Sequence, residues 1–348
     1  MTFAEYCQQN SDAIYNAILT YLPAKEPREH YTMVRDYTQR RGKYARPNLA
    51  LLWTELFGTT KENVFSYACG IQMAEDWFLM HDDWMDQNEL RRGKPSAHKL
   101  YGDVFAINAG DAVQAAMWKM IHEDSTQTPP ILPLSGEEYA IKHRLFEKFY
   151  DIIMVTIEGQ YYDLKLAREK DITKFTLEDY WQSIHAKAAY YSVYGPMQLG
   201  AIAANKSDTE VAEIKKYGEK IGRAFQVKDD ILDCISTEAT LGKTIGNDVL
   251  EGTKTAILWH FVKNSSAEEL ELVKNIYTKD RTQKTAEEIK NVLELFQKTG
   301  SIAYAEKLVD QLAEEALIEF EQQTASLPKT EIKDTARDAI RSMAERNS

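Results

Sequence analysis

Two acidic motifs of the form DDxxD stand far apart in this sequence of 348 residues. The first contributes Asp82, Asp83 and Asp86, and the second contributes Asp229, Asp230 and Asp233. On a helix, the first and last carboxylates of such a motif lie on one face. Carboxylates held this close repel one another unless a cation lies among them, and oxygen-only ligands favour Mg²⁺. The spacing therefore predicts two helices that bind Mg²⁺ and, through it, the phosphates of a substrate.

The surroundings of the two motifs bear on whether they are functional. A single DDxxD in a chain with 54 acidic residues is also typical of a solvated helix face. Here apolar residues precede each copy: Phe78, Leu79 and Met80 the first, and Ala224, Phe225 and Val227 the second. Both helices are therefore expected to be half-buried, with their carboxylates pointing into a cavity. We expect the two motifs to converge across one pocket.

The elements that position the motifs are predicted to be helices. Apolar residues recur at three- and four-residue spacing over Phe65–Phe78, Leu145–Leu166, Val211–Ile231 and Ile302–Phe320. The chain has only 16 glycines and 9 prolines, and no alternating strand pattern of useful length. The clearest break, Ser125–Gly136, is too short for an interdomain linker. An all-α protein is predicted, in which residues 1–348 form a single domain.

Composition excludes several classes of function. The net charge of −12 argues against general electrostatic binding of nucleic acid. No apolar run is long enough to span a bilayer, and the N-terminus does not resemble a signal peptide. The three cysteines (Cys7, Cys69 and Cys234) are scattered without a metal-binding spacing, which indicates reduced thiols. These features predict a cytoplasmic protein.

Two basic clusters accompany the acidic motifs, at Arg41–Pro47 and Glu89–Pro95. In the second cluster, a glycine and a proline are expected to end the helix that carries the first motif. Arg91 and Arg92 would then lie at the C-terminal end of that helix. The planar fork of arginine suits phosphate oxygens. Either cluster alone is also typical of an ordinary charged surface. Beside carboxylate metal sites, the two clusters suggest two phosphorylated substrates.

The stretches HDDWMD, RRGKP, FQVKDDILD, GKTIGND and GTKT occur in this order, and together they resemble the trans-isoprenyl diphosphate synthase family. The resemblance is to the short-chain farnesyl and geranylgeranyl type, and it runs from about Gly42 to Thr255. It implies a helix bundle of the isoprenoid-synthase fold around a deep central apolar cavity, usually assembled as a homodimer. The implied reaction is a Mg²⁺-dependent head-to-tail condensation of isopentenyl diphosphate with an allylic diphosphate.

The resemblance also assigns roles to individual residues. All six motif aspartates would bind Mg²⁺, with three ions in each active site and Mn²⁺ as an alternative ion. Residues expected to bind the substrates are Lys43, Arg46, Glu75, Arg91, Arg92, Lys187, Gln226, Lys243 and Lys254. Within this set, Lys43, Arg46 and Arg92 would hold isopentenyl diphosphate. Arg91 and the three other lysines would contact the allylic diphosphate, and Lys187, Gln226 and Lys243 would act in catalysis.

Three positions depart from the family pattern. Glu75 stands seven residues before Asp82, where relatives usually carry glutamine or histidine near isopentenyl diphosphate. A carboxylate beside a diphosphate is repulsive unless it is protonated or turned towards a lysine. Ala188 replaces a common threonine near the carbocation, and Arg41 replaces a glycine.

Chain length is expected to depend on Trp77 and Phe78, five and four residues before Asp82. In relatives, bulky rings at these positions form a floor that stops chain growth. Two aromatic residues resemble the farnesyl-type arrangement, so farnesyl diphosphate is predicted as the main product and geranylgeranyl diphosphate as the next.

Two other functions remain open at this point. A class I terpene cyclase shares the first motif, but it usually carries an Asn/Ser/Glu-type triad where this chain has Asp229. A non-catalytic, prenyltransferase-like regulatory subunit is the second alternative, and the departures at Glu75 and Ala188 keep it open. Release of hydrocarbon without isopentenyl diphosphate would favour cyclisation, whereas inactivity of the purified protein would favour the regulatory role.

Overall fold

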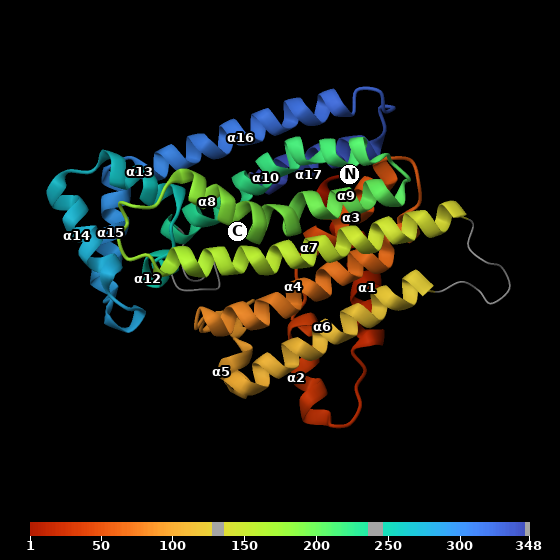
Figure 1. Cartoon of the computed structure of the whole chain (residues 1–348), viewed down its shortest axis with the longest axis horizontal. Coiled ribbons are helices and arrows are strands. Elements are labelled where there is room, and N and C mark those ends of the chain that lie inside the picture. The colour runs from red at the N-terminus through yellow and green to blue at the C-terminus, as the bar shows by residue number, and fades with distance from the viewer. Residues whose placement is uncertain (127–135, 236–245, 345–348) are drawn as a thin grey trace. The chain divides into compact units, whose positions relative to one another are not determined.

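The structure is a computed structural model that describes residues 1–126, 136–235 and 246–344 (Figure 1). The chain divides into two compact units, each assembled from separate stretches of sequence. The first unit comprises Met1–Ile153, Tyr191–Lys215 and Gln323–Ala339. The second comprises Met154–Tyr190, Lys216–Gln322 and Ile340–Ser348. That residues 1–348 form one domain stays a prediction.

Helices account for nearly all of the first unit. Its helices are α1 (Phe3–Tyr21), α2 (Arg28–Gln39), α3 (Ala45–Leu56), η1 (Lys61–Val64), α4 (Phe65–Met85), α5 (Ala97–Tyr101), α6 (Asp103–Thr126) and α9 (Gly195–Ala203). A two-stranded antiparallel hairpin, β1 (Leu90–Arg91) and β2 (Lys94–Pro95), follows α4. Five helices contribute residues to both units: α7 (Gly136–Arg168), η2 (His185–Tyr194), α10 (Asp208–Ile235), α16 (Ser301–Gln323) and α17 (Glu331–Ala344).

The second unit contains α8 (Leu177–Ile184), α12 (Asn247–Glu251), α13 (Ala256–Asn264), α14 (Ala267–Thr278), η3 (Arg281–Gln283) and α15 (Ala286–Lys298). Several of these helices begin with a capping box, in which an N-cap hydroxyl accepts from a backbone N–H and an acidic side chain accepts in return. Thr176 and Asp179 cap α8 in this way, and Ser266 and Glu269 cap α14. Such local signals set where the short helices start.

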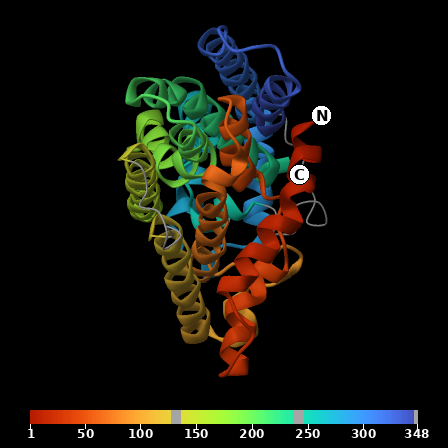
Figure 2. The same ribbon diagram turned by 90° about the vertical axis from the view of Figure 1, so that its right-hand side faces the viewer.

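Helix α4, which carries the first acidic motif, lies in the core of the first unit. It runs beside α6 and also contacts α3 (Figures 1 and 2). Tyr67 of α4 is fully buried and packs edge-on against Phe149 of α7, with ring centroids 5.8 Å apart. Because apolar side chains cover most of its surface, α4 presents the motif at its C-terminal end from a rigid support.

The sequence predicted the helices well but misplaced the end of α4. All four predicted helical stretches lie within α4, α7, α10 and α16. The expectation that the glycine and proline of the second basic cluster end α4 is wrong, because α4 ends at Met85. Beyond it, Gln87 and Arg92 have φ of 51° and Gly93 has φ of 73°. These left-handed conformations are incompatible with a continuing right-handed helix. The two arginines therefore lie on a hairpin.

Two further expectations concern the membrane and the cysteines. Across residues 1–126, 136–235 and 246–344, no helix has the length and apolar character that crossing a bilayer requires. The cysteines form no disulfide within the same part of the chain. Most of the predicted central break, residues 127–135, lies outside the described residues.

Candidate active site

The first acidic motif closes the last turn of α4, where the Asp86 backbone N–H donates to the Asp82 carbonyl at 2.8 Å. Asp83 is fully buried, whereas Asp82 and Asp86 are half-buried. The three carboxylates therefore differ in environment although their spacing is regular.

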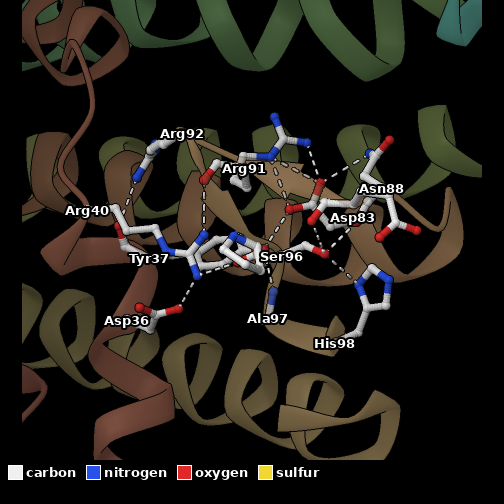
Figure 3. A network of polar contacts seen from close by, with 12 residues as sticks. Asp36, Tyr37, Arg40, Asp83, Asn88, Arg91, Arg92, Ser96, Ala97 and His98 are labelled. Atoms are coloured by element: carbon white, nitrogen blue, oxygen red, sulfur yellow. Dashed lines mark hydrogen bonds and ion pairs between the residues drawn. The ribbon is translucent and has the colours of Figure 1, made fainter. Parts of the chain in front are cut away.

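Protein donors surround the carboxylate of Asp83 (Figure 3). Arg91 Nε lies 3.0 Å from both of its oxygens, and the Tyr37 hydroxyl donates to Oδ2 at 2.6 Å. Asn88 Nδ2 donates to Oδ1 at 3.1 Å. A buried ion pair is tolerated when its remaining hydrogen-bonding capacity is satisfied in this way. Asp83 thus ties the acidic motif to the basic hairpin, and its predicted role as a metal ligand stays a prediction.

Arg40, which directly follows α2, contacts the hairpin as well (Figure 3). Its guanidinium donates to the carbonyls of Arg91 at 3.0 Å and Pro95 at 2.9 Å, and it pairs with Asp36. The group also stacks over the Tyr37 ring, 4.6 Å from the centroid. Sequence reasoning missed Arg40 and Tyr37, because their partners lie about fifty positions further along the chain and no local motif marks them.

The Tyr37 hydroxyl also accepts a hydrogen bond from the Ala97 backbone N–H at 3.0 Å. Burial, followed by the neighbouring Asp83 charge, raises the pKa of Tyr37, so its hydroxyl stays protonated and can donate. The Ser96 hydroxyl lies 3.2 Å from Nδ1 of the buried His98.

The structure brings together three residues expected near isopentenyl diphosphate. Arg46 Nη1 lies 3.1 Å from Glu75 Oε1, and Arg92 Nη2 lies 3.4 Å from the same oxygen. Arg46 is also held by the Ser192 hydroxyl at 3.0 Å and stacks 4.7 Å above the Tyr191 ring centroid. Glu75 is thus turned towards two arginines rather than towards a lysine.

The protonation of this acidic pair follows from its neighbours. Burial alone would raise the pKa of Glu75, but Arg46 and Arg92 bring it below its ordinary value. The adjacent Asp76 is also buried, and burial raises its pKa to about 6 although Arg92 opposes the rise. Asp76 accepts hydrogen bonds from the Thr38 hydroxyl at 2.8 Å and from Arg92 at 3.3 Å. Lys43, on the loop before α3, is exposed.

The second acidic motif lies on α10 in the second unit, where its buried carboxylates are engaged by protein donors. The Tyr180 hydroxyl donates to Asp230 Oδ2 at 2.5 Å, and Gln226 Nε2 donates to Oδ1 at 3.0 Å. Burial, reinforced by the neighbouring motif carboxylates, raises the pKa of Asp230. Asp233 Oδ2 accepts from the backbone N–H of Asp248 at 3.0 Å, which caps the start of α12. Asp229 is half-buried.

Lys187 lies on η2, which is a π-helix, and its ammonium pairs with Asp163 of α7 at 2.6 Å. The π-helical backbone is wide, so the residues of adjacent helices that lie closest to it must be glycines. A Cβ at Gly159 would lie 2.3 Å from Lys187 N, and one at Gly222 would lie 2.3 Å from Ala189 Cβ. Single π-turns are common at functional sites. Sequence reasoning missed Asp163, because its partner Lys187 lies 24 residues further along the chain and no local motif marks the pair.

Lys254 is buried, and its ammonium donates to the Gly252 carbonyl at 2.8 Å. Lys254 and Lys284 lie 5.4 and 5.3 Å from the centroid of the Tyr277 ring. Burial and then the Lys284 charge lower the pKa of Lys254 to about 8. The remaining predicted lysine, Lys243, lies outside the described residues.

The two aromatic residues expected to limit chain length contact each other, with ring centroids 4.5 Å apart. Trp77 is buried and also packs edge-on against His81. Phe78 packs edge-on against Tyr191 at 5.5 Å. The ring of Phe78 is therefore supported by the π-helix within the first unit.

No ready-made metal cluster is present in the three described ranges, since nowhere in them do three or more His, Cys, Asp or Glu side chains come close enough to hold an ion. The donor chemistry nevertheless fits Mg²⁺: Asp82 and Asp86 offer carboxylate oxygens one helical turn apart and are half-buried. Convergence of the two motifs stays a prediction.

Comparison with known proteins gives a consistent result. The family model described as "Polyprenyl synthetase" matches residues 27–296. The chain is 32% identical over 264 residues to a short chain isoprenyl diphosphate synthase of Methanothermobacter thermautotrophicus, covering 76% of this chain and 75% of that protein. It is 27% identical over 319 residues to a geranylgeranyl diphosphate synthase of Methanosarcina mazei, covering 90% of each. The crystal structure of geranylgeranyl pyrophosphate synthetase from Pyrococcus horikoshii superimposes with a TM-score of 0.83 at 27% identity, covering 99% of this chain and 98% of that one.

Proposed function

Because this chain belongs to the polyprenyl synthetase family, we propose that it joins isopentenyl diphosphate head to tail to an allylic diphosphate and releases an all-trans prenyl diphosphate. The protein is a prenyltransferase. One observation supports the residue assignments: the ion pair between buried Asp83 and half-buried Arg91 links the first acidic motif to the arginine hairpin. Groups suited to metal on α4 and groups suited to phosphate on the hairpin are thereby held together.

Carboxylates of both acidic motifs would hold Mg²⁺, as three ions in each active site with Mn²⁺ as a substitute. In the first motif, Asp82 and Asp86 are the more accessible ligands, and Asp83 would support them while holding Arg91. In the second, Asp229 would be the accessible ligand, with Asp230 and Asp233 supporting it. Bound Mg²⁺ would neutralise the charge that develops on the departing diphosphate.

Cationic side chains would bind and polarise the allylic diphosphate. Arg91, Lys187, Lys243 and Lys254 form this group. As the C–O bond breaks, their charges stabilise the leaving diphosphate. Gln226, which donates to Asp230, would orient that carboxylate beside the substrate that it is expected to bind. The carbocation left behind must be kept from water, and the predicted apolar cavity would do this.

Isopentenyl diphosphate would be held by Lys43, Arg46 and Arg92, beside Glu75. Its double bond attacks the allylic cation to form the new C–C bond. Loss of one proton to the released diphosphate then completes the reaction, so no side-chain nucleophile is required.

For chain length, we favour geranylgeranyl diphosphate over the farnesyl diphosphate predicted from the sequence. Relatives named as geranylgeranyl diphosphate synthases support this choice.

A homodimer is proposed from an exposed apolar surface of the first unit. Leu100 of α5 and Val104 and Phe105 of α6 are 47%, 79% and 58% exposed. Adjacent large apolar side chains at the surface mark protein–protein contacts. Sedimentation of Phe105→Glu should give a monomer if this face forms the dimer. A cytoplasmic location is retained as part of the proposal.

The test is product analysis of the purified protein with Mg²⁺ and labelled isopentenyl diphosphate. Dimethylallyl, geranyl and farnesyl diphosphates are supplied as alternative starters. Prenyl diphosphates ending at the geranylgeranyl length are expected. Hydrocarbon release without isopentenyl diphosphate would instead identify a terpene cyclase. Absence of turnover with every starter would identify a regulatory subunit.

A further inference from the structure

The carboxylate of Glu75 forms ion pairs with the two arginines that the proposed function assigns to isopentenyl diphosphate. A single carboxylate oxygen, Oε1, lies 3.1 Å from Arg46 Nη1 and 3.4 Å from Arg92 Nη2. The side chain of Glu75 is 14% exposed, that of Arg46 24% and that of Arg92 17%. Bulk water therefore screens their charges only in part. In the protein without substrate, each guanidinium therefore already faces an anion.

The carboxylate is charged under ordinary conditions. Burial would raise the pKa of Glu75, but Arg46 and then Arg92 outweigh burial and lower it. An anionic substrate entering this place meets a fixed negative charge in contact with its own binding groups. It must either displace Glu75 from the arginines or bind beside it, and both cost affinity.

Neither arginine depends on Glu75 alone for its position. Arg46 donates from Nε to the Ser192 hydroxyl and lies over the Tyr191 ring. Arg92 donates from Nη1 to the Tyr37 carbonyl at 2.8 Å. Removal of the charge at position 75 should therefore leave both guanidinium groups in place.

We propose that Glu75 is an internal competitor of isopentenyl diphosphate and sets a low affinity for that substrate. This inference rests on the proposed function, because it takes Arg46 and Arg92 as the diphosphate-binding groups. Glu75 acts by charge: it does not touch the reacting atoms, and it leaves the allylic diphosphate unaffected. High concentrations of isopentenyl diphosphate would then be needed to drive chain extension.

The variant Glu75→Gln keeps the size and polarity of the side chain while removing its charge. KM for isopentenyl diphosphate should fall by about tenfold, which corresponds to the loss of one partly screened like-charge contact. The value of kcat and the KM for the allylic substrate should stay within about twofold of the parent values. Titration calorimetry of isopentenyl diphosphate alone should show the same tightening of Kd without turnover.

Glu26→Gln is the matched control, because Glu26 also pairs with an arginine, Arg28, but both side chains are exposed. It should change neither KM nor Kd. Glu75→Met provides a second neutral side chain of similar length, should the glutamine variant fail to fold. An unchanged or weaker Kd for isopentenyl diphosphate in a folded Glu75 variant would overturn the inference.

Failure of the proposed function would give a different pattern. In that case, the parent protein would form no prenyl product, but inorganic diphosphate would still bind more tightly to Glu75→Gln than to the parent. Equal binding of inorganic diphosphate and of isopentenyl diphosphate to both proteins would instead refute competition by Glu75.

Discussion

Replacing Tyr37 by phenylalanine should loosen the arginine hairpin. The change removes a fully buried hydroxyl that donates to Asp83 Oδ2 at 2.6 Å and accepts from the Ala97 N–H at 3.0 Å. A hydrogen bond to a buried charge contributes about 2 kcal/mol, and a stranded buried N–H costs about 1 kcal/mol more. We therefore expect the free energy of unfolding to fall by about 3 kcal/mol.

Thermal unfolding followed by circular dichroism is a suitable assay. For a chain of this length, the expected loss lowers Tm by on the order of 5 °C. Hydrogen exchange should show where the loss arises, with faster exchange at the hairpin and at the start of α5 and little change in α9. Tyr31→Phe, on the same helix, is the control, because the contacts of its ring with His30 and Lys25 survive the change.

One result would refute this reasoning. If Tyr37→Phe lowered Tm no more than the control and left hairpin exchange unchanged, the hydroxyl would not be what couples α2, the first acidic motif and the hairpin. The position of Arg91 would then have to depend on Arg40 and Asn88.

Three further predictions concern the site. Trp77→Ala should lengthen the prenyl product by at least one isoprene unit and Phe78→Ala by less, as measured by chromatography; unchanged products from both would place the floor elsewhere. The KM for the allylic diphosphate should rise above a pH of about 8, because Lys254 then loses its proton. Removing the neighbouring positive charge in Lys284→Gln should shift that rise to higher pH. An unshifted profile would exclude coupling of the two lysines. Arg40→Lys, which cannot span both hairpin carbonyls, should raise the allylic KM by about tenfold with less effect on kcat; an unaltered KM would show that the hairpin holds itself.

The helices that carry both motifs could be predicted because their apolar residues repeat with helical spacing. A helix forms where the apolar residues of such a repeat are buried together, as in α4 and α10. The end of α4 could not be predicted, because the chain turns at Gln87 and Arg92, two non-glycine residues in left-handed conformations. Their propensities give no signal, and only the tertiary contacts of the hairpin stabilise them.

The sequence named candidate site residues, whose roles stay predictions, but it did not indicate which protein groups they pair with. Arg91, expected to contact substrate, is held by Asp83, and Lys187 is held by Asp163. Such pairs depend on how the hairpin and the helices fold against one another, which no local sequence pattern indicates. The π-helical form of η2 was also missed, since it requires glycines on neighbouring helices.

The central claim is that both acidic motifs serve one reaction. The most direct test is the rate of diphosphate release from geranyl diphosphate and isopentenyl diphosphate with Mg²⁺, measured for Asp82→Asn, Asp229→Asn and the double variant. Each single change should lower kcat by at least about 100-fold, and the double change should lower it little further, because groups acting as a unit are not additive. Full activity in either single variant, or additive losses in the double variant, would contradict the claim.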